Sequence, residues 1–296
     1  MPRLLVLLGL GPRYADRVNT TNFESSASWL EPDWPAIAGV QALFTCRQGG
    51  RSSAPWDSMN LGDHVGDDPW PVAANRQLLA DVIAQRCGQA VRPVFMQQVH
   101  GWDVQVRDRE AIEAQAFDAC VSESQEVACT IMVADCLPVL IAHQSGVVVG
   151  AAHAGWRGLA GAHGYGVLEA LWQAYASKLQ LHGITENIAS HTQVWLGPCI
   201  GPSAFEVGDA VRSTFAQSPQ TQACFAAHNA QPGKWLADLA QLARLRLRQM
   251  GITHVYGNDG APAWCTVGNP SLFFSHRRDA AVLGTTGRMA ACIWKT

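Results

Sequence analysis

A cysteine and a histidine, two residues able to bind a metal or to act as nucleophile and base, stand at the ends of two neighbouring predicted strands. The strands are short apolar runs, Leu137 to Ala142 and Val147 to Ala152, separated by a turn containing Ser145-Gly146. Cys136 precedes the first run and His153 follows the second. If the strands pair as an antiparallel hairpin, the start of one lies beside the end of the other. The pattern therefore predicts that Cys136 and His153 lie together.

A third side chain of this kind, His100, follows a predicted strand over Pro93 to Val99. Thiolate sulfur and imidazole nitrogen are natural zinc ligands, and a catalytic zinc takes three protein ligands and leaves a fourth position open. His100, Cys136 and His153 would supply that set. Their spacing matches no local zinc signature, and a single buried Cys or His is usually structural. Their shared position at strand ends, beside Gly or Asp, favours the metal site.

The same side chains allow a second interpretation. Cys136 would be the nucleophile and His153 its base in an acyl-transfer or amide hydrolase. Spacing alone does not separate this dyad from a metal site. His64 and Glu206 are candidate free acid or base groups, although a residue in an exposed loop more often has no catalytic role.

Arginines in glycine-containing loops are candidate anion-binding residues. Arg157 lies in the loop Gly155 to Gly158, and the pair Arg277-Arg278 precedes Asp279. Their planar guanidinium groups can hold phosphate or carboxylate, although a single arginine is more often a surface or salt-bridged residue. Cys199, in a Gly-Pro-bracketed loop with backbone amides available to a ligand, is a metal neighbour, a pocket wall or, by default, a core residue.

The elements that must position these residues alternate along the chain and predict one interleaved α/β domain without an internal repeat or a clean linker. Residues 1 to about 28 show no sustained periodicity and are expected to form an extension. Further strands are predicted over Ile37 to Cys46, Val104 to Val106, Asp118 to Val121, Ala128 to Ala134, Val194 to Leu196, His254 to Tyr256 and Met289 to Trp294. Helices are predicted over Pro71 to Cys87, Gly166 to Leu179, Val207 to Phe215 and Lys234 to Met250.

The composition is that of a globular protein with a sizeable core, since 48% of the residues are hydrophobic and 15% charged. A net charge of −3 argues against nucleic acid as a partner. The nine cysteines are odd in number and form no C-x-x-C pair, which favours a reducing, cytoplasmic location. The apolar start, MPRLLVLLGLG, lacks the cleavage site of a signal peptide, and no run approaches the roughly 20 residues that span a membrane.

Eight short motifs, taken together and in order, closely resemble the YfiH family, which is also called the multicopper polyphenol oxidase laccase-domain or peptidoglycan-editing-factor family. The resemblance runs from about Trp29 to the C-terminus, so 29–296 is expected to be the catalytic domain. The motifs are N-L-G-D-H-x-G-D (60–67), N-R (75–76), Q-V-H-G (98–101), A-D-C-L-P-V (134–139), A-A-H-A-G-W-R-G (151–158), G-P-C-I-G-P-x-x-F-E-V-G (197–208), F-F-S-H-R-R-D (273–279) and T-G-R-M (286–289).

The resemblance implies a single-domain α-β-β-α sandwich similar to the catalytic domain of cytotoxic necrotizing factor. It also implies one metal per chain, zinc or alternatively copper, held by His100, Cys136 and His153. Family members are described as purine nucleoside phosphorylases that deaminate adenosine and phosphorolyse methylthioadenosine. They are also described as copper-dependent polyphenol oxidases and as hydrolases that edit a muramyl-peptide precursor of peptidoglycan.

Ligand chemistry favours the first of these activities. A laccase needs several coppers and a separate His-rich cluster, and ten scattered histidines with no H-x-H pair do not supply one. One His₂Cys site with an open position suits zinc-assisted attack of water on C6 of adenine. Phosphorolysis also needs an anion site, for which Arg76, Arg157, Arg277 and Arg278 are the candidates. The predicted partners are therefore a nucleoside and phosphate, with neither nucleic acid nor a membrane.

The chain departs from the family pattern at two positions. Trp264 stands where the family often has Arg, and His276 stands where it often has Tyr. Both are expected to lie near the pocket, so both bear on nucleoside preference.

Overall fold

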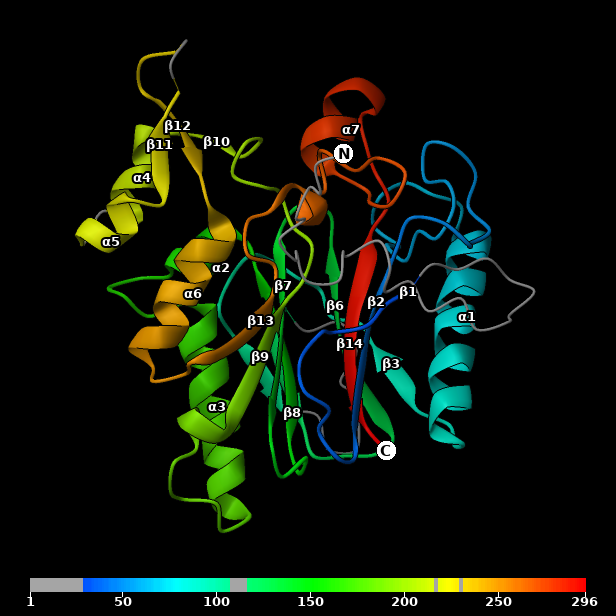
Figure 1. Ribbon diagram of the computed structural model, residues 1–296. Helices are drawn as coiled ribbons and strands as arrows, with labels where there is room; N and C mark the ends of the chain where they lie inside the picture. The colour runs from blue at the N-terminus through cyan, green and yellow to red at the C-terminus, as the bar shows by residue number, and fades with distance from the viewer. Residues whose placement is uncertain (1–28, 107–115, 216–217, 229–230) are drawn as a thin grey trace, which may run out of the picture.

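The predicted hairpin lies at the centre of the molecule. Strand β7 (Leu137–His143) pairs antiparallel with β8 (Val149–Ala154), and every residue of both strands is buried. The computed structural model describes residues 29–106, 116–215, 218–228 and 231–296 (Figure 1). The extension predicted for residues 1–28 lies outside this range.

The hairpin belongs to a six-stranded sheet with the order β13-β9-β7-β8-β5-β4. Its two outer pairs, β13 with β9 and β4 with β5, are parallel, and the inner pairs are antiparallel. The remaining strands of this sheet are β4 (Val104–Val106), β5 (Ala119–Ser122), β9 (Thr192–Leu196) and β13 (His254–Gly257).

A five-stranded sheet has the order β1-β2-β14-β6-β3 and takes the C-terminal strand into its middle. β14 pairs antiparallel with both β2 and β6. The strands are β1 (Trp29–Leu30), β2 (Val40–Thr45), β3 (Arg92–Val94), β6 (Val127–Val133) and β14 (Met289–Lys295). A small third sheet joins β10 (Glu206–Gly208), β12 (Lys234–Ala237) and β11 (Phe225–Ala227).

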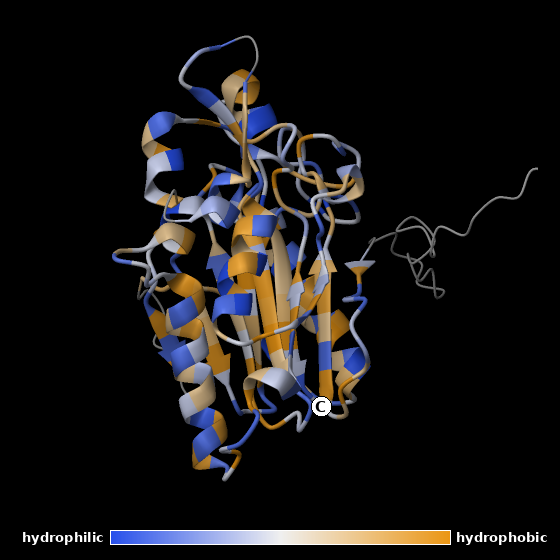
Figure 2. Ribbon diagram, turned by 60° about the vertical axis from the view of Figure 1, so that its left-hand side comes forward, coloured by the Kyte–Doolittle hydropathy of each residue, from blue (hydrophilic) through white to orange (hydrophobic). Residues whose placement is uncertain are grey.

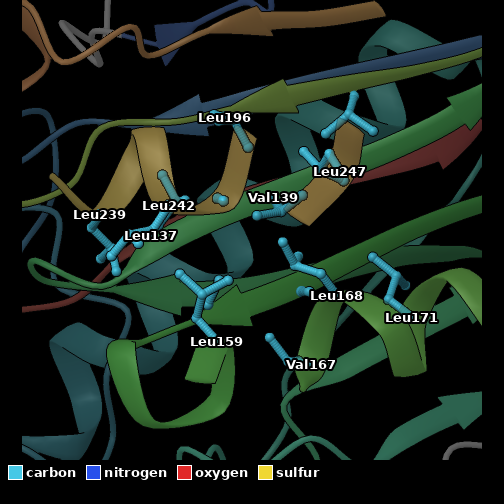
Figure 3. Close-up of a cluster of buried hydrophobic side chains, with 14 of the residues drawn as sticks. Leu137, Val139, Leu159, Val167, Leu168, Leu171, Leu196, Leu239, Leu242 and Leu247 are labelled. Carbon is cyan, nitrogen blue, oxygen red and sulfur yellow. The ribbon is translucent and has the colours of Figure 1, made fainter. Parts of the chain in front are cut away.

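The alternation of side chains along the strands stacks the two large sheets between helices. On β14, Ala291 and Ile293 pack between the sheets, whereas Ala290 and Cys292 face α1 (Pro69–Cys87). The six-stranded sheet turns its other face to α3 (Val167–Leu181) and α6 (Leu239–Gln249), whose leucines surround Leu137 and Val139 of β7 (Figure 3). The result is four layers, α-β-β-α, in a single mixed α/β domain. This confirms the predicted fold class, while the likeness to cytotoxic necrotizing factor stays a prediction.

The helices cover the outer faces of the sheets and are apolar mainly where they meet them. Figure 2 shows hydrophobic colour concentrated on the inner strands and mixed with hydrophilic colour along the outer helices. No helix in the described ranges is long and apolar enough to cross a membrane. Besides α1, the helices are α2 (Trp156–Ala160), α3 (Val167–Leu181), α4 (Asp209–Phe215), α5 (Pro219–Gln222), α6 (Leu239–Gln249) and α7 (His276–Leu283), with 3₁₀ turns at Ala189–His191 and Pro262–Trp264.

The helix predicted over Lys234 to Met250 is wrong in its first part. Residues 234–237 form β12, and α6 begins only after Asp238, whose carboxylate accepts a hydrogen bond from the N–H of Gln241. Cross-strand pairing therefore overrides the helical pattern of this segment, since β12 pairs with strands on both sides. For the same reason, the helix predicted from Val207 begins at Asp209, because Val207 belongs to β10.

Two predicted strand ends also differ from those observed. β3 ends at Val94, so His100 stands on a loop and not directly after the strand predicted to Val99. His153 lies inside β8, one residue before its end. The structure therefore contains the strands that were predicted around the site, but they end at other residues than predicted.

Candidate metal centre

The site forms where strand ends from both sheets meet. β6 ends at Val133 and β14 begins at its partner Met289, while β7 begins at Leu137 opposite Ala154 at the end of β8. Residues 134–136 carry the chain from one sheet to the other between β6 and β7. This short crossing brings the two pairs of strand ends to the same edge of the sandwich.

Strand alternation turns Cys136 and His153 to the same side. Leu140 and Ala151 lie in the core between the sheets. Because every second residue of a strand faces the same side, Cys136 shares the face of Leu140, and His153 shares that of Ala151. In the hairpin register His153 is opposite Pro138, two residues from Cys136. The prediction that the two side chains lie together is confirmed.

The three predicted ligands form a compact cluster. Their donor atoms all lie within 4.8 Å of one another, and the described residues hold no other such group of three or more His, Cys, Asp or Glu. His100 Nε2 is 3.6 Å from Cys136 Sγ. A tetrahedral zinc with bonds of about 2.0–2.1 Å to nitrogen and about 2.3 Å to sulfur needs a spacing of roughly 3.5 Å between such atoms. The donor set therefore fits a metal ion.

Asp118, directly before β5, holds two of the ligands at once. Its Oδ1 accepts hydrogen bonds from His153 Nδ1 at 2.8 Å and from the His100 N–H at 3.0 Å. Its Oδ2 accepts from the N–H groups of Gly101 at 2.6 Å and Val99 at 3.2 Å. The side chain is fully buried. This carboxylate therefore orients both the imidazole of His153 and the loop that carries His100.

The hydrogen bonds of Asp118 also fix which nitrogen of His153 faces the cluster. Burial alone would raise the pKa of Asp118, but the hydrogen bond and charge of His153 and the backbone N–H groups lower it. The ionised carboxylate can only accept, so Nδ1 of His153 carries a proton. Nε2 is the ring nitrogen left to face Cys136 and His100.

Charge coupling activates the thiol. Burial would raise the pKa of Cys136, but the charge of His153 and hydrogen bonds from His100 and His153 lower it overall. Burial would lower the pKa of His153, but the Cys136 charge and the hydrogen bond to Asp118 raise it overall. A thiolate at Cys136 is both the metal-binding and the nucleophilic form of cysteine.

The backbone around the cluster is strained and tightly packed. His100 and Asp135 have positive φ angles of 62° and 90°, which side-chain-bearing residues rarely adopt. Gly155 leaves room for the ligands, because a Cβ there would lie 2.8 Å from His100 Cδ2 and 3.0 Å from Cys136 Sγ. A larger residue would therefore displace the ligands.

The cluster opens into a cavity of about 400 Å³, a size typical of small-molecule sites. Apolar side chains such as Trp156 and Phe205 share its wall with cationic ones. The lining residues are His64, Gln98, His100, Met132, Val133, Ala134, Asp135, Cys136, His153, Trp156, Arg157, Ile200, Phe205, Leu239, His276, Arg277 and Arg288. A larger cavity of about 1060 Å³ adjoins α1, but two of its charged residues, Arg47 and Asp57, pair with each other, and it contains none of the metal donors.

Similar proteins place the chain in a family. The family model described as multi-copper polyphenol oxidoreductase laccase matches residues 41–296. A Pseudomonas aeruginosa protein named purine nucleoside phosphorylase is 43% identical over 267 residues, which cover 90% of this chain and 98% of the relative. Escherichia coli K12 purine nucleoside phosphorylase YfiH is 42% identical over 266 residues, with the same coverage of 90% and 98%. The chain belongs to the YfiH family.

Solved structures of YfiH-like proteins share the fold. The crystal structure of a Neisseria meningitidis protein matches with a TM-score of 0.75 and 41% identity, covering 90% of this chain and 98% of that one. YlmD from Geobacillus stearothermophilus matches with a TM-score of 0.74 and 33% identity, covering 93% and 98%. The resemblance found in the sequence motifs is thus confirmed over most of the chain.

The other predicted site residues of this YfiH-family chain divide into two groups. His64, Arg157 and Arg277 line the cavity with the metal donors, as does His276. Arg76, Cys199, Glu206 and Arg278 do not line it. Trp264, expected near the pocket, instead packs between the sheets against Trp195 with ring centroids 6.1 Å apart.

The side chains outside the cavity have structural partners. Arg278 donates to the carbonyls of residues 266 and 273 and pairs with Asp279. Arg76 donates to the carbonyl of residue 61 and pairs with Asp63 at 3.1 Å, and Cys199 is buried against Asn258. Glu206 pairs with Lys234 at 3.0 Å.

Asp118 and Arg288 are among the residues at the site that were not predicted. Each stands beside a strand terminus at the same edge as the ligands, since Asp118 precedes β5 and Arg288 precedes β14. The signal that could have identified both was a charged residue at the start of a predicted buried strand, since Asp118 is the first residue of one predicted strand and Arg288 directly precedes another.

Proposed function

We propose that the chain is a zinc-dependent purine nucleoside phosphorylase acting on adenosine, inosine and methylthioadenosine, and that the same site deaminates adenosine. The observation that carries the proposal is the meeting of His100, Cys136 and His153 with cationic side chains in one cavity of about 400 Å³. The names of the bacterial relatives supply the substrate class.

In phosphorolysis, a phosphate oxygen forms a bond to C1′ of the ribose while the C1′–N9 bond breaks. The electron pair passes to N9, and the purine gains a proton. Arg157 and Arg277 contribute positive charge for phosphate, and His64 and His276 are the groups in the cavity wall able to donate the proton. Trp156 offers an apolar surface for the base.

In deamination, water adds to C6 of adenine and ammonia leaves. A zinc held by the three ligands would supply a Lewis acid that favours ionisation of that water at neutral pH. His153, fixed by Asp118, keeps Nε2 directed at the cluster. His64 is the proposed proton-transfer group, exposed at the cavity edge beside Asp63.

A direct test measures the metal content of the purified chain and follows adenosine by chromatography with and without phosphate. We expect about one zinc per chain, inosine in both incubations, and free base only with phosphate. Cys136→Ser should lose metal and both activities, whereas Cys87→Ser, in α1 and outside the cavity, serves as the matched control. Several coppers per chain, with oxidation of phenols, would contradict the proposal.

A second candidate rests on the thiolate. Cys136, His153 and Asp118 have the order of contacts of a nucleophile, its base and an orienting carboxylate. This arrangement suits a hydrolase acting on an amide of a muramyl-peptide precursor. The thiolate would attack the carbonyl carbon to form a thioester while the amine leaves with a proton from His153, and water would then release the acid.

Alkylation separates the two candidates, because one sulfur cannot bind zinc and attack a carbonyl simultaneously. Under the proposed function, zinc protects Cys136 from iodoacetamide, and its removal by a chelator exposes the thiolate to rapid modification. A metal-free protein that forms a covalent adduct at Cys136 with a muramyl peptide, and that is inert to nucleosides, would favour the hydrolase.

The absence of disulfides supports a reducing location, since none of the nine cysteines, all of which lie in the described ranges, forms one. We extend the proposal to a cytoplasmic enzyme whose catalytic domain is 29–296, with 1–28 as an extension.

A further inference from the structure

Arg288 has the features of an oxyanion receptor beside the metal donors. It lines the same cavity as Cys136 and His153 and is half-buried. Its Nη1 donates to the carbonyls of Thr286 at 3.0 Å and Gly287 at 3.2 Å. Within the described chain, Nε and Nη2 have no hydrogen-bond partner and are not among the buried polar atoms without one. These two atoms form one edge of the guanidinium, which matches two oxygens of phosphate or carboxylate.

Asp135 is the carboxylate whose charge acts on Arg288, but its hydrogen bonds go to other residues. Asp135 Oδ1 accepts a hydrogen bond from the hydroxyl of Thr266 at 2.5 Å, and its Oδ2 accepts from the N–H of Arg277 at 2.6 Å. The hydrogen bonds of Arg288 within the described ranges include none to Asp135, so the Nε–Nη2 edge is available to a ligand.

The other two arginines of the cavity are less suited to this role. Arg277 donates through Nη1 and Nη2 to the carbonyls of Ala204 and Glu206, so its end is occupied. Arg157 is exposed and lies over the Trp156 ring with its Cζ 4.5 Å from the centroid. Arg288 combines burial, fixed position and a free edge, the conditions under which an ion contact is strong.

The segment Asn60 to Gly62 holds Arg288 in place. Asn60 Oδ1 accepts from the N–H of Arg288 at 2.9 Å, and the N–H of Leu61 donates to the Arg288 carbonyl at 3.0 Å. A Cβ on Gly62 would lie 2.7 Å from Arg288 Cγ. The side chain therefore runs over Gly62, and this contact explains why a glycine suits the N-L-G-D segment.

We propose that Arg288 is the phosphate-binding residue of the site, taking two oxygens of inorganic phosphate on its Nε–Nη2 edge. The proposal rests on the proposed phosphorylase function and assigns its anion subsite to a residue held by the segment 60–62. Asn60, Gly62 and Arg288 thus form one unit, in which the first two position the third.

Direct binding tests the subsite without requiring turnover. Inorganic phosphate is titrated calorimetrically into the full, zinc-loaded chain and into Arg288→Gln, Arg288→Lys, Gly62→Ala and Arg92→Gln. Loss of a charge-assisted bidentate contact should raise the phosphate Kd about 10- to 100-fold in Arg288→Gln. Arg288→Lys retains the charge without the fork and should fall between wild type and Arg288→Gln. Arg92, exposed and outside the cavity, should have no effect.

Gly62→Ala distinguishes position from charge. It retains every arginine but displaces the Arg288 side chain, so we expect a rise in phosphate Kd of about tenfold or more at unchanged zinc content. If Arg288→Gln does not fold, Arg288→Lys and Gly62→Ala carry the test. A phosphate Kd within twofold of wild type in these folded, zinc-loaded variants overturns the proposal. A wild-type chain that binds no phosphate, or binds acetate more tightly, also overturns it.

Kinetics separate this inference from the proposed function. If phosphate binds through Arg288 but nucleosides are not converted, the subsite stands and the phosphorylase proposal fails. If adenosine is phosphorolysed and Arg288→Gln has the wild-type KM for phosphate, the function stands and the assignment of Arg288 fails.

Discussion

Replacing Asp118 by Asn should weaken metal binding and destabilise the fold together. The carboxylate accepts four hydrogen bonds, two on each oxygen, from His153 and from the N–H groups of residues 99–101. An amide has one oxygen and one NH₂ group. In either orientation the NH₂ group faces two donors, so two buried hydrogen bonds are lost.

The expected size follows from those contacts. Each buried donor left without an acceptor costs about 1–3 kcal/mol, so the metal-free chain should lose about 2–6 kcal/mol of unfolding free energy. Loss of the carboxylate that orients a metal-binding histidine typically lowers metal affinity about 10- to 100-fold. Zinc Kd is measured by competition with a chromogenic chelator, and stability by urea unfolding of the metal-free chain.

Asp279→Asn is the matched control. Asp279 is also buried and accepts hydrogen bonds from Ser275 and Thr286, but it does not line the cavity. It should lose stability and retain the wild-type zinc Kd. A zinc Kd for Asp118→Asn within twofold of that of Asp279→Asn would refute the argument that Asp118 orients the ligands.

Three further predictions test the packing and charges that support the site. Gly155→Ala should raise the zinc Kd at least about tenfold, because the added Cβ would meet His100 and Cys136. Gly208→Ala, where a Cβ would meet open space, is the control. Equal zinc affinities of the two variants would contradict the prediction. Asp279 should make the stability of the chain fall in acid. Burial raises the pKa of this carboxyl, but hydrogen bonds from Arg278 and Thr286 lower it overall. The stabilisation from Asp279 is therefore present above the unfolded pKa of about 3.9 and is lost as the pH falls from there through the folded pKa. Urea unfolding between pH 6 and 3 should then show a smaller loss for Asp279→Asn than for wild type, and parallel curves would exclude this role. Leu140→Ala should cost about 2–5 kcal/mol in the core between the sheets, whereas Leu181→Ala, 80% exposed, should change the urea midpoint little.

The hairpin of the site could be predicted because its sequence carries a strong local signal. β7 and β8 are covered on both faces and therefore read as continuous apolar runs bounded by a glycine turn. Pairing of two adjacent strands then places Cys136 beside His153 without further information. Helix α1 could also be predicted from local sequence, because Asp68 caps its start and Gly88, with a φ angle of 70°, ends it.

The position of His100 depends on contacts distant in sequence. The residue stands on a loop with positive φ and is held through Asp118, 18 positions along the chain. The periodicity of apolar residues gives no information about such a distant contact. This explains why the predicted strand runs to Val99, beyond its observed end. The helix predicted over residues 234–237 was wrong for a related reason, because the sequence pattern there fits a helix and only pairing with β10 and β11 selects a strand.

The assignment of arginines shows the limit of reasoning from residue type. Arg277 and Arg278 are adjacent and equally cationic, yet Arg277 lines the cavity while Arg278 fastens the segments 266–267 and 273 to Asp279. Arg288, which was not among the predicted site residues, enters the cavity because β14 is inserted between β2 and β6. Strand order, which the residue type does not reveal, thus decides that Arg288 lines the cavity.

Strand order also links the chemistry to completion of the fold. β14 supplies the central strand of one sheet and, immediately before it, Arg288, while β7 and β8 of the other sheet supply Cys136 and His153. Cys136 and His153 therefore belong to one sheet and the cationic edge to the other, and the two meet only when the core between the sheets is packed. Because that packing fixes their relative position, the proposed nucleoside site at this edge of the sandwich is preorganised by the same apolar contacts that stabilise the domain.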